Sequence, residues 1–515
     1  MGYMQNRFSK KELGLITTPY KTADYIINKL GAINQNQLIL DPCAGPGIFI
    51  KRLVKKGINM KQIHAYDISS EYEDNIRALG IHFERKDTLL SITEVDYNHY
   101  DFIIGNPPYL NKSSSYVREN RKELRKIYGK INSHETYSMF IINSIWRLKE
   151  GGKMAFITSD SFLTLKTHQR LRKFILRNCV IDELLLAPQD LFSSQNVSTS
   201  PAIIVLTKCS KKRQREIRLR NQIRIVDRVK NEEEYINPEK VVKIFQKSYY
   251  ALPFNIFYID IEPQIISFFE KAPKLVNYIK GYIGMHTHNN KKYIAAIEGT
   301  ILEEIFEKRK VKKDVSNDHY QIIPRENLEH ESWKPYLKRG GAEQYYRPIM
   351  EALDWRESAK KIYDIPDKVP FESEGIVISG VSSRLAARYM PRGCYWDSNK
   401  AIGCTILDEC LSIEYALGLL NSSLYNYLAK GIINNTNSIQ LSGIHALPII
   451  IPDFKTKNLV EKYVKRIIAK LKHDDHYSYE YEQKKIDNII FNLHQNEFDL
   501  PESLKQKLDK NFSIY

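Results

Sequence analysis

Two carboxylates and one amide each end a short apolar segment in the first part of the chain. Asp41 ends the run QLILD and opens the glycine-rich stretch DPCAGPGIF, Asp67 ends QIHAYD, and Asn106 ends YDFIIGN. A glycine turn after a strand lets the backbone approach a ligand closely, and an acid at the end of the next strand can bind ribose hydroxyls. Because the third glycine of G-x-G-x-x-G is absent, the turn alone does not distinguish a nucleotide-binding site from a plain tight turn.

The motif Asn106-Pro107-Pro108-Tyr109 follows the third of these runs. Two consecutive prolines cannot continue a strand or a helix, so they make a rigid exit from the sheet. Asparagine offers a carbonyl acceptor and an amide donor, and tyrosine offers a flat face on which a base can stack. The motif therefore predicts recognition of a planar group that carries an amine.

The elements that would position these residues alternate between strand and helix. A helix ahead of them is predicted with Thr18 as N-cap, Pro19 at its first position and Gly31 after its end. This rhythm is typical of a doubly wound α/β fold, with ligands bound at the carboxyl ends of the strands. Strands are expected at 37–41, 62–67, 100–106, 152–160, 180–186 and 202–208, and helices at 47–56, 70–79, 135–149 and 167–178.

The length of 515 residues favours two or three domains. We expect a catalytic domain at 1–225, a connecting segment at 226–265 and a second, mixed α/β domain at 266–515. The basic stretch 208–224 is interpreted as the domain edge, and an amphipathic helix is expected at 481–495. The formal net charge of +16 favours a polyanionic partner, since phosphate contacts release condensed counterions.

The order D-P-x-x-G-x-G, an acidic strand end, then N-P-P-Y resembles the gamma class of adenine-N6 DNA methyltransferases. This class resembles the Taq I methyltransferase and accompanies bacterial restriction–modification systems. The resemblance implies a Rossmann-like class I methyltransferase sheet, S-adenosylmethionine as methyl donor and a flipped-out adenine of double-stranded DNA as acceptor. Looser patterns in the second half resemble the family's C-terminal target-recognition domain.

The resemblance also implies roles for single residues. Asn106 to Tyr109 match the clamp for the target base, and Phe192 matches an aromatic residue on the other side of that base. This sequence departs from the family at Pro46, which lacks a backbone N–H in the cofactor loop. The catalytic set is Asn106, Pro107, Pro108, Tyr109 and Phe192, and the cofactor set is Thr18, Pro19, Asp41, Cys43, Ala44, Gly45, Gly47, Asp67, Ile68 and Asp87.

A metal site is not expected. The histidines of His286-x-His288 lack further ligands and are interpreted as a polar loop facing DNA, and Cys404 and Cys410 have the wrong spacing for zinc. The stretch from Glu482 to Lys484 resembles a nuclease E-x-K motif but lies on a predicted helix. Six cysteines without a C-x-x-C pair fit a reducing cytosol.

The expected partner is double-stranded DNA, with a separate cognate restriction endonuclease left open. The chain is expected to be a monomer in the cytoplasm of a bacterium or archaeon, without a membrane segment. Two alternatives stay open: an RNA adenine-N6 methyltransferase, and an inactive DNA-specificity protein on a methyltransferase fold. Phosphate or base contacts are expected from basic residues of the second half: Lys338, Arg339, Arg384, Arg388 and Arg392.

Overall fold

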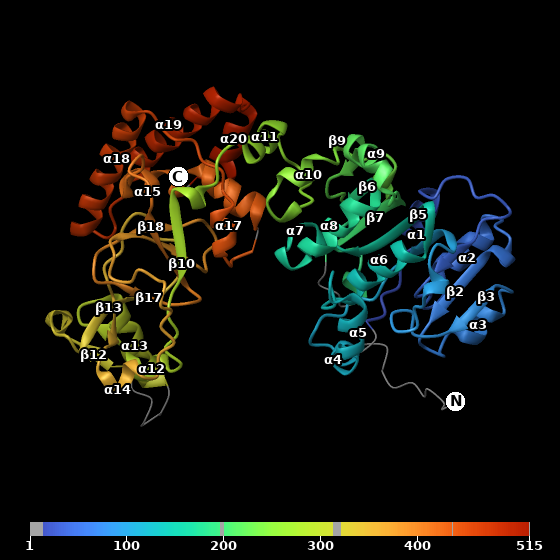
Figure 1. The fold of residues 1–515 in the computed structure, drawn as a ribbon, viewed down its shortest axis with the longest axis horizontal. Coiled ribbons are helices and arrows are strands. Elements are labelled where there is room, and N and C mark those ends of the chain that lie inside the picture. Colours follow the sequence, from blue (N-terminus) through green and yellow to red (C-terminus); the bar gives the residue numbers. More distant parts are fainter. Residues whose placement is uncertain (1–13, 196–199, 313–320, 435, 514–515) are drawn as a thin grey trace. The chain divides into compact units, whose positions relative to one another are not determined.

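The computed structural model describes residues 14–195, 200–312, 321–434 and 436–513, without the side chains of 309–312. It divides into two compact units, Met1–Asp260 and Ile261–Tyr515, of which the first is built on one large sheet (Figure 1). The order of this sheet is β3-β2-β1-β4-β5-β7-β6-β8-β9. Its strands are β1 Ile39–Asp41, β2 Ile63–Asp67, β3 His82–Arg85, β4 Tyr100–Gly105, β5 Leu148–Ser159, β6 Cys179–Leu186, β7 Pro201–Lys208, β8 Gln222–Val226 and β9 Val241–Phe245.

Neighbouring strands from β3 to β5 are parallel, whereas β7 runs antiparallel to both β5 and β6. All six predicted strands are present, and the predicted doubly wound fold is confirmed. The predicted helices are also present, as α2 Ile48–Lys55, α3 Glu73–Arg77, α6 Thr136–Arg147 and α8 Gln169–Asn178.

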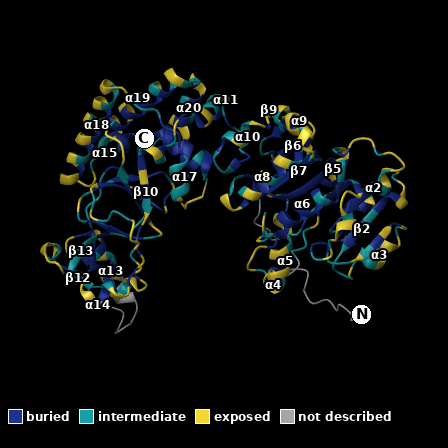
Figure 2. Ribbon diagram, in the orientation of Figure 1, coloured by how far each residue is buried: buried dark blue, intermediate teal, exposed yellow. Residues whose placement is uncertain are grey.

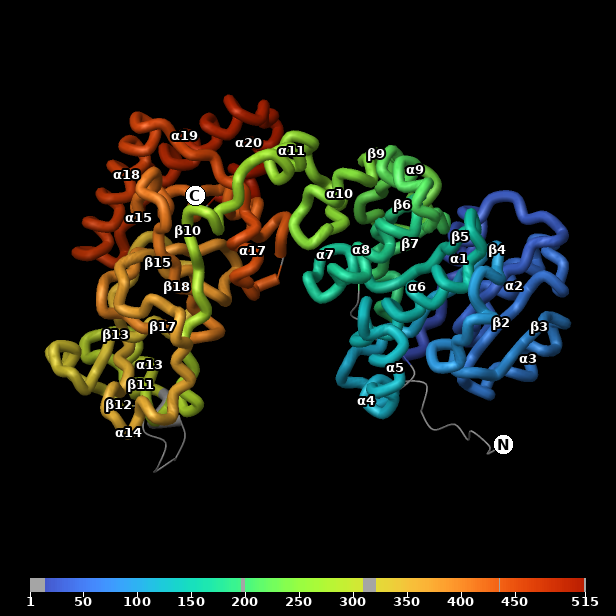
Figure 3. Tube along the Cα trace, viewed as in Figure 1, coloured from blue at the N-terminus to red at the C-terminus, as the bar shows by residue number. Residues whose placement is uncertain are grey.

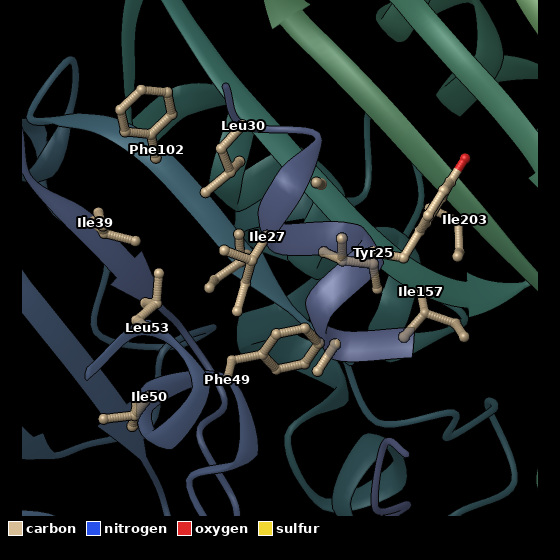
Figure 4. Close-up of a cluster of buried hydrophobic side chains, with 14 of the residues drawn as sticks. Tyr25, Ile27, Leu30, Ile39, Phe49, Ile50, Leu53, Phe102, Ile157 and Ile203 are labelled. Carbon is tan, nitrogen blue, oxygen red and sulfur yellow. The ribbon is translucent and has the colours of Figure 1, made fainter. Parts of the chain in front are cut away.

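Helices α1 (Tyr20–Asn28) and α2 cover one face of the sheet. Tyr25 and Ile27 of α1 and Phe49 of α2 pack on alternate strand residues, such as Ile39 and Ile157, as Figure 4 shows. Alternation along a strand points the next residues to the opposite face, where α6 and α8 contact β5 and β6. The central strands are therefore buried on both sides, as Figure 2 shows, which explains their continuous apolar runs.

The structure corrects two expectations about the end of the first unit. The basic stretch 208–224 is not a domain edge, because it contains α9 (Arg215–Arg220) and leads into β8. Residues 226–260 do not form a connecting segment either, since β9 pairs antiparallel with β8 at the edge of the sheet. Strands β8 and β9 therefore extend the first unit beyond the predicted strands, and β3 is a third strand that the sequence did not predict.

The second unit is a mixed α/β structure, as expected. A four-stranded sheet has the order β10-β18-β15-β16, and a five-stranded sheet has the order β12-β11-β14-β13-β17. The strands are β10 Ile279–Ile283, β11 Ile294–Ile297, β12 Gln321–Ile323, β13 Trp333–Leu337, β14 Glu351–Asp354, β15 Gly375–Ser379, β16 Ala387–Met390, β17 Tyr395–Trp396 and β18 Ala401–Ile406.

Long helices complete the second unit: α15 Ile413–Asn421, α18 Phe454–His473, α19 Glu480–Phe498 and α20 Glu502–Asn511. Helices α18 and α19 lie side by side in the tube of Figure 3, and α19 confirms the helix expected at 481–495. At Gly418 of α15, a Cβ atom would lie 2.4 Å from Cγ1 of Val460, so glycine permits the close approach of α15 and α18. Among the described helices, none combines the length and apolar character that crossing a membrane requires.

Candidate active site

The candidate site lies at the carboxyl ends of β1 and β4. Strand β1 stands between β2 and β4, so the order of the sheet reverses at this point. In open α/β sheets, ligands bind in the crevice at such a reversal. Asp41 ends β1, Asp67 ends β2 and Asn106 follows β4. The fold therefore brings the three singled-out polar side chains to one edge of the sheet.

The glycine-rich turn is tied to the end of β2. Gly45 and Gly47 have φ angles of +50° and +73°, which residues other than glycine rarely adopt. The Gly45 N–H donates to Oδ2 of Asp67 at 2.7 Å, and the Ser69 N–H donates to Oδ1 at 2.8 Å. Burial raises the pKa of the Asp67 carboxyl, although these N–H donors oppose the shift. The Asp67 carboxylate therefore ties the glycine-rich turn to the segment that follows β2.

Asp41 is buried beneath this turn. Its Oδ1 accepts from the Cys43 N–H at 3.2 Å, whereas its buried Oδ2 has no hydrogen-bond partner among the described residues. Burial, with a smaller contribution from Asp67, raises the pKa of Asp41 to about 8. A buried acceptor without a donor is costly, so Oδ2 is suited to a donor or a cation from a ligand.

The Asn106 side chain is held through its amide nitrogen. Nδ2 donates to the carbonyl of Ile16 and to Oγ1 of Thr18, each at 3.1 Å. The predicted N-cap role of Thr18 is wrong, because Pro19 stands at the N-cap and Thr18 binds Asn106 instead. The buried Oδ1 of Asn106 has no partner among the described residues. Since Nδ2 is already used on two acceptors, Oδ1 is the atom that the site presents to a ligand.

The segment before α1 packs on the site through more residues than the predicted Thr18 and Pro19. A Cβ atom on Gly45 would lie 3.0 Å from Cδ1 of Leu15. The backbone of Thr17 exchanges two hydrogen bonds with the Gln195 side chain, at 2.7 and 2.8 Å. Only Thr18 and Pro19 were singled out here. A contact made by a main-chain acceptor, such as the Ile16 carbonyl, cannot be predicted from the type of residue.

The exit from β4 is held by Thr136, the first residue of α6. Its hydroxyl donates to the carbonyl of Pro108 and accepts from the Leu110 N–H at 3.0 Å, while the Thr136 N–H donates to the Leu110 carbonyl at 2.9 Å. Thr136 is buried and distant in sequence from the motif. Sequence reasoning missed this residue, because only the fold shows that α6 begins beside the two prolines.

Two aromatic rings lie beside Tyr109 of the motif. The ring of Tyr109 lies 6.4 Å from that of Phe192 and 6.3 Å from that of Tyr137, at interplanar angles of 67° and 81°. Phe192 is almost fully buried in the core beside α1. The structure thus brings Phe192 next to Tyr109, but the two rings are edge-to-face. A base between two parallel faces would need one ring to rotate.

The remaining predicted cofactor residues line the same edge. Asp87 accepts from the Leu89 and Leu90 N–H groups at 3.0 and 3.1 Å, and the Tyr116 hydroxyl lies 3.0 and 2.9 Å from its two oxygens. Burial raises the pKa of Asp87. A carboxylate has about four acceptor positions, so Asp87 retains capacity for one more donor. Ile68 is half-buried directly after β2.

The N–H groups of the glycine-rich loop are already used within the protein. Besides the bonds of Cys43 and Gly45, the Ala44 N–H donates to the Tyr66 carbonyl and the Gly47 N–H donates to the Ala44 carbonyl, both at 2.9 Å. The missing N–H of Pro46 therefore does not interrupt a set of free donors. The loop offers a close-fitting backbone surface, and the carboxylates offer the hydrogen-bonding groups.

The structure narrows the set of basic residues expected to contact DNA. The Arg388 side chain is only 2% exposed, so the expectation that it contacts DNA is wrong. Lys338 and Arg339 form ion pairs with Asp397 and Glu351 in the second unit, and Arg384 donates to the carbonyl of Ser513 at 3.0 Å. The Arg392 side chain is 84% exposed. Of the five, Arg392 has the exposure that a phosphate contact needs.

Residues 32–192, which contain most of this site, match the Eco57I restriction-modification methylase family. The expected resemblance to restriction–modification methyltransferases is confirmed. The chain is 34% identical over 186 residues to the type II methyltransferase M.HincII of Haemophilus influenzae, a match that covers 35% of this chain and 34% of that protein. M.VspI of Vibrio sp. (strain 343) is 25% identical over 180 residues, which are 33% of this chain and 43% of M.VspI. The alignments thus span well under half of these curated relatives.

Solved structures resemble a longer part of the chain. The type IIL restriction-modification enzyme MmeI in complex with DNA matches with a TM-score of 0.54 at 13% identity, over 94% of this chain and 73% of that chain. The DrdV–DNA complex matches with a TM-score of 0.53 at 14% identity, over 89% and 57%. At such low identity these matches show that the fold is shared, and they extend this likeness into the second unit.

Proposed function

We propose that the chain is a site-specific DNA methyltransferase that transfers the methyl group of S-adenosylmethionine to the N6 amine of adenine in double-stranded DNA. The first unit would bind the cofactor and the target base, and the second unit would recognise the DNA sequence. The chain would act as the modification component of a restriction–modification or related defence system. The observation that carries this proposal is the buried Oδ1 of Asn106 at the exit of β4, which has no partner within the described part of the chain.

Asn106 would act on the amine of the base. Its Oδ1 and the carbonyl of Pro107 would accept the two amine hydrogens, which draws the nitrogen toward sp³ geometry and frees its lone pair for attack on the methyl group. Because Nδ2 is held by Ile16 and Thr18, the amide cannot rotate to present the wrong atom. Acceptors fixed before the reaction are the kind of group that stabilises a developing positive charge.

The cofactor fits the residues beside Asn106. When bound, S-adenosylmethionine would supply an electrophilic methyl group, because breaking its sulfur–methyl bond releases a neutral thioether as the leaving group. The unpartnered Oδ2 of Asp41 suits its ammonium group, Asp67 suits the ribose hydroxyls, and the remaining acceptor capacity of Asp87 suits the adenine amine. Cys43 is not required as a nucleophile, and burial raises the pKa of its thiol well above the ordinary value.

The target base must leave the duplex, because its amine is buried by pairing and stacking. Tyr109 offers the stacking face, worth about 1–3 kcal/mol per base. Phe192 is the proposed second face, with the ring rotation noted above. The net charge of +16 supports DNA as the substrate, and solved relatives of the same fold are titled as DNA complexes.

A direct test compares DNA from cells that express the wild type, Asn106→Ala or Asn59→Ala. Asn59 is an exposed asparagine that caps a short helix and serves as the matched control. Modification-sensitive sequencing should find methylated adenine in one sequence context for the wild type and Asn59→Ala, and none for Asn106→Ala.

Each other outcome rejects part of the proposal. Methylated adenine with Asn106→Ala would refute the catalytic role of this residue. Methylation of RNA alone in a tritiated-cofactor assay would favour an RNA enzyme. Sequence-specific DNA binding without methyl transfer to either nucleic acid would favour an inactive specificity protein.

A further inference from the structure

Two histidines of the second unit project from one side of an anchored loop. Met285 and Thr287 are buried, whereas His286 and His288 alternate with them and are exposed. The Met285 N–H donates to the Trp396 carbonyl at 2.9 Å, which fixes one end of the loop. The backbone bends at His288, and its ring still lies beside that of His286. The two imidazoles therefore share one face, and their ring centres are 4.6 Å apart.

A carboxylate from a distant part of the sequence completes the group. His286 and Asp364 exchange two backbone hydrogen bonds, at 3.1 and 3.0 Å, so the two segments are joined independently of their side chains. Oδ2 of Asp364 lies 2.8 Å from Nε2 of His288. His288 has a φ angle of +59°, a left-handed conformation that is uncommon for residues other than glycine. Such conformations persist where the surrounding structure fixes them, and they concentrate at ligand sites.

We propose that His286, His288 and Asp364 bind a divalent transition-metal ion of the zinc type. Two imidazoles and one carboxylate are ligands that zinc prefers, and three protein ligands leave one position for water. From the sequence only the two histidines could be singled out, and a metal site was not expected because a pair of histidines without a third ligand does not make one. The third ligand comes from the pairing of two segments that only the fold brings together. The proposal is independent of methyl transfer.

The three candidate ligand atoms must move closer together to bind an ion. The candidate ligand atoms all lie within 4.8 Å of one another, whereas bonds of about 2.0–2.1 Å in a tetrahedral site separate ligand atoms by about 3.3 Å. All three side chains are exposed, so rotation about their side-chain bonds can supply this movement. The ion would replace the direct contact between Nε2 of His288 and Oδ2 of Asp364, and it would join the loop at 285–288 to the segment around Asp364.

The test measures zinc bound by the full-length protein after treatment with a chelator and dialysis against a low concentration of zinc chloride. Wild type is compared with His288→Ala, Asp364→Asn and His476→Ala. His476 is the matched control, because it is an exposed histidine 3.6 Å from the carboxylate of Asp475 and has no third ligand among the described residues. We expect the wild type and His476→Ala to retain one more equivalent of zinc than the two site variants. Visible absorption of the cobalt-loaded protein should show the same loss.

Thermal unfolding in the presence of chelator checks that the variants are folded, and zinc should then raise the unfolding midpoint of the wild type and His476→Ala alone. Equal zinc content in all four proteins would overturn the proposal. If the site variants kept their zinc content but bound DNA more weakly, the proposal would also be overturned, because the three residues would then contact DNA.

Discussion

Replacing Thr136 with valine tests whether α6 holds the base clamp in its working position. The hydroxyl of Thr136 makes two hydrogen bonds to the turn, one to the Pro108 carbonyl and one from the Leu110 N–H. Valine has nearly the same shape and makes neither bond. The hydroxyl bonds to main-chain atoms of the turn and not to a group proposed to contact the base or the cofactor, so Thr136 is a positioning residue.

The magnitude follows from those two bonds. A buried partner left without its hydrogen bond costs about 1–3 kcal/mol, so the loss of both bonds in Thr136→Val should lower the free energy of unfolding by about 2–6 kcal/mol. A displacement of about 1 Å at the reacting groups lowers a rate about 100-fold, and we expect a loss of about that size in the methyl-transfer rate. Thr136→Ser keeps the hydroxyl and loses one methyl group, at a cost of about 0.8 kcal/mol, and should retain most of the rate.

The assay is single-turnover transfer of a tritiated methyl group to duplex DNA, well below the unfolding midpoint of either variant. Calorimetry measures the affinity for S-adenosylmethionine, which should be nearly the same in both, because the Asp41 and Asp67 contacts are untouched. The reasoning is refuted if the folded valine variant transfers methyl groups within about twofold of the serine variant. If Thr136→Val weakened S-adenosylmethionine binding but left the transfer rate unchanged, Thr136 would support the cofactor site and not the base clamp.

Three further predictions concern the carboxylates and the basic surface. Asp67→Asn should weaken S-adenosylmethionine binding by about tenfold or more, because charge-assisted hydrogen bonds contribute about 1.5–3 kcal/mol; unchanged affinity by calorimetry would contradict the ribose role. Since burial raises the pKa of Asp41 to about 8, the folded state holds its proton more tightly than the unfolded state. The free energy of unfolding should therefore fall as pH rises from about 4 to about 8, and chemical denaturation of Asp41→Asn across this window should show a smaller fall. Arg392→Ala should reduce the salt dependence of DNA binding by about one phosphate contact, because this side chain is exposed. Arg388→Ala should instead lower the unfolding midpoint, because this side chain is buried. The opposite pattern would show that burial does not decide which arginine contacts DNA.

The predicted strands and helices of the first sheet were confirmed because their signals are local. Apolar runs of strand length, ended by Asp41, Asp67 or Asn106, depend on side chains that are buried on both faces of a sheet. Glycine at 31, with a φ angle of +81°, likewise follows the end of α1 as predicted. Signals of this kind can be recognised without knowledge of the fold, because each residue type indicates its own burial or backbone conformation.

The edge of the sheet was harder to predict. Strands β8 and β9 lie in a segment rich in charged residues, and alternate residues of β9 are exposed. An edge strand needs fewer apolar residues than a central strand, so residues 226–260 were interpreted as a connecting segment. The N-cap prediction for Thr18 was wrong for a related reason, since a hydroxyl suited to capping a helix is equally suited to a side-chain amide.

The sequence by itself determined the class of fold, the position of the glycine turn and the rigid exit at Asn106 to Tyr109, because backbone restrictions and burial patterns are properties of single residues and their near neighbours. Only the tertiary structure decided which partners those residues have. The Ile16 carbonyl and Thr18 on Asn106, Thr136 on the proline exit and Asp364 beside the two histidines all join segments that are distant in sequence. A hydrogen bond or a metal site depends on where two atoms meet in space, and only the packing of the whole chain sets that distance.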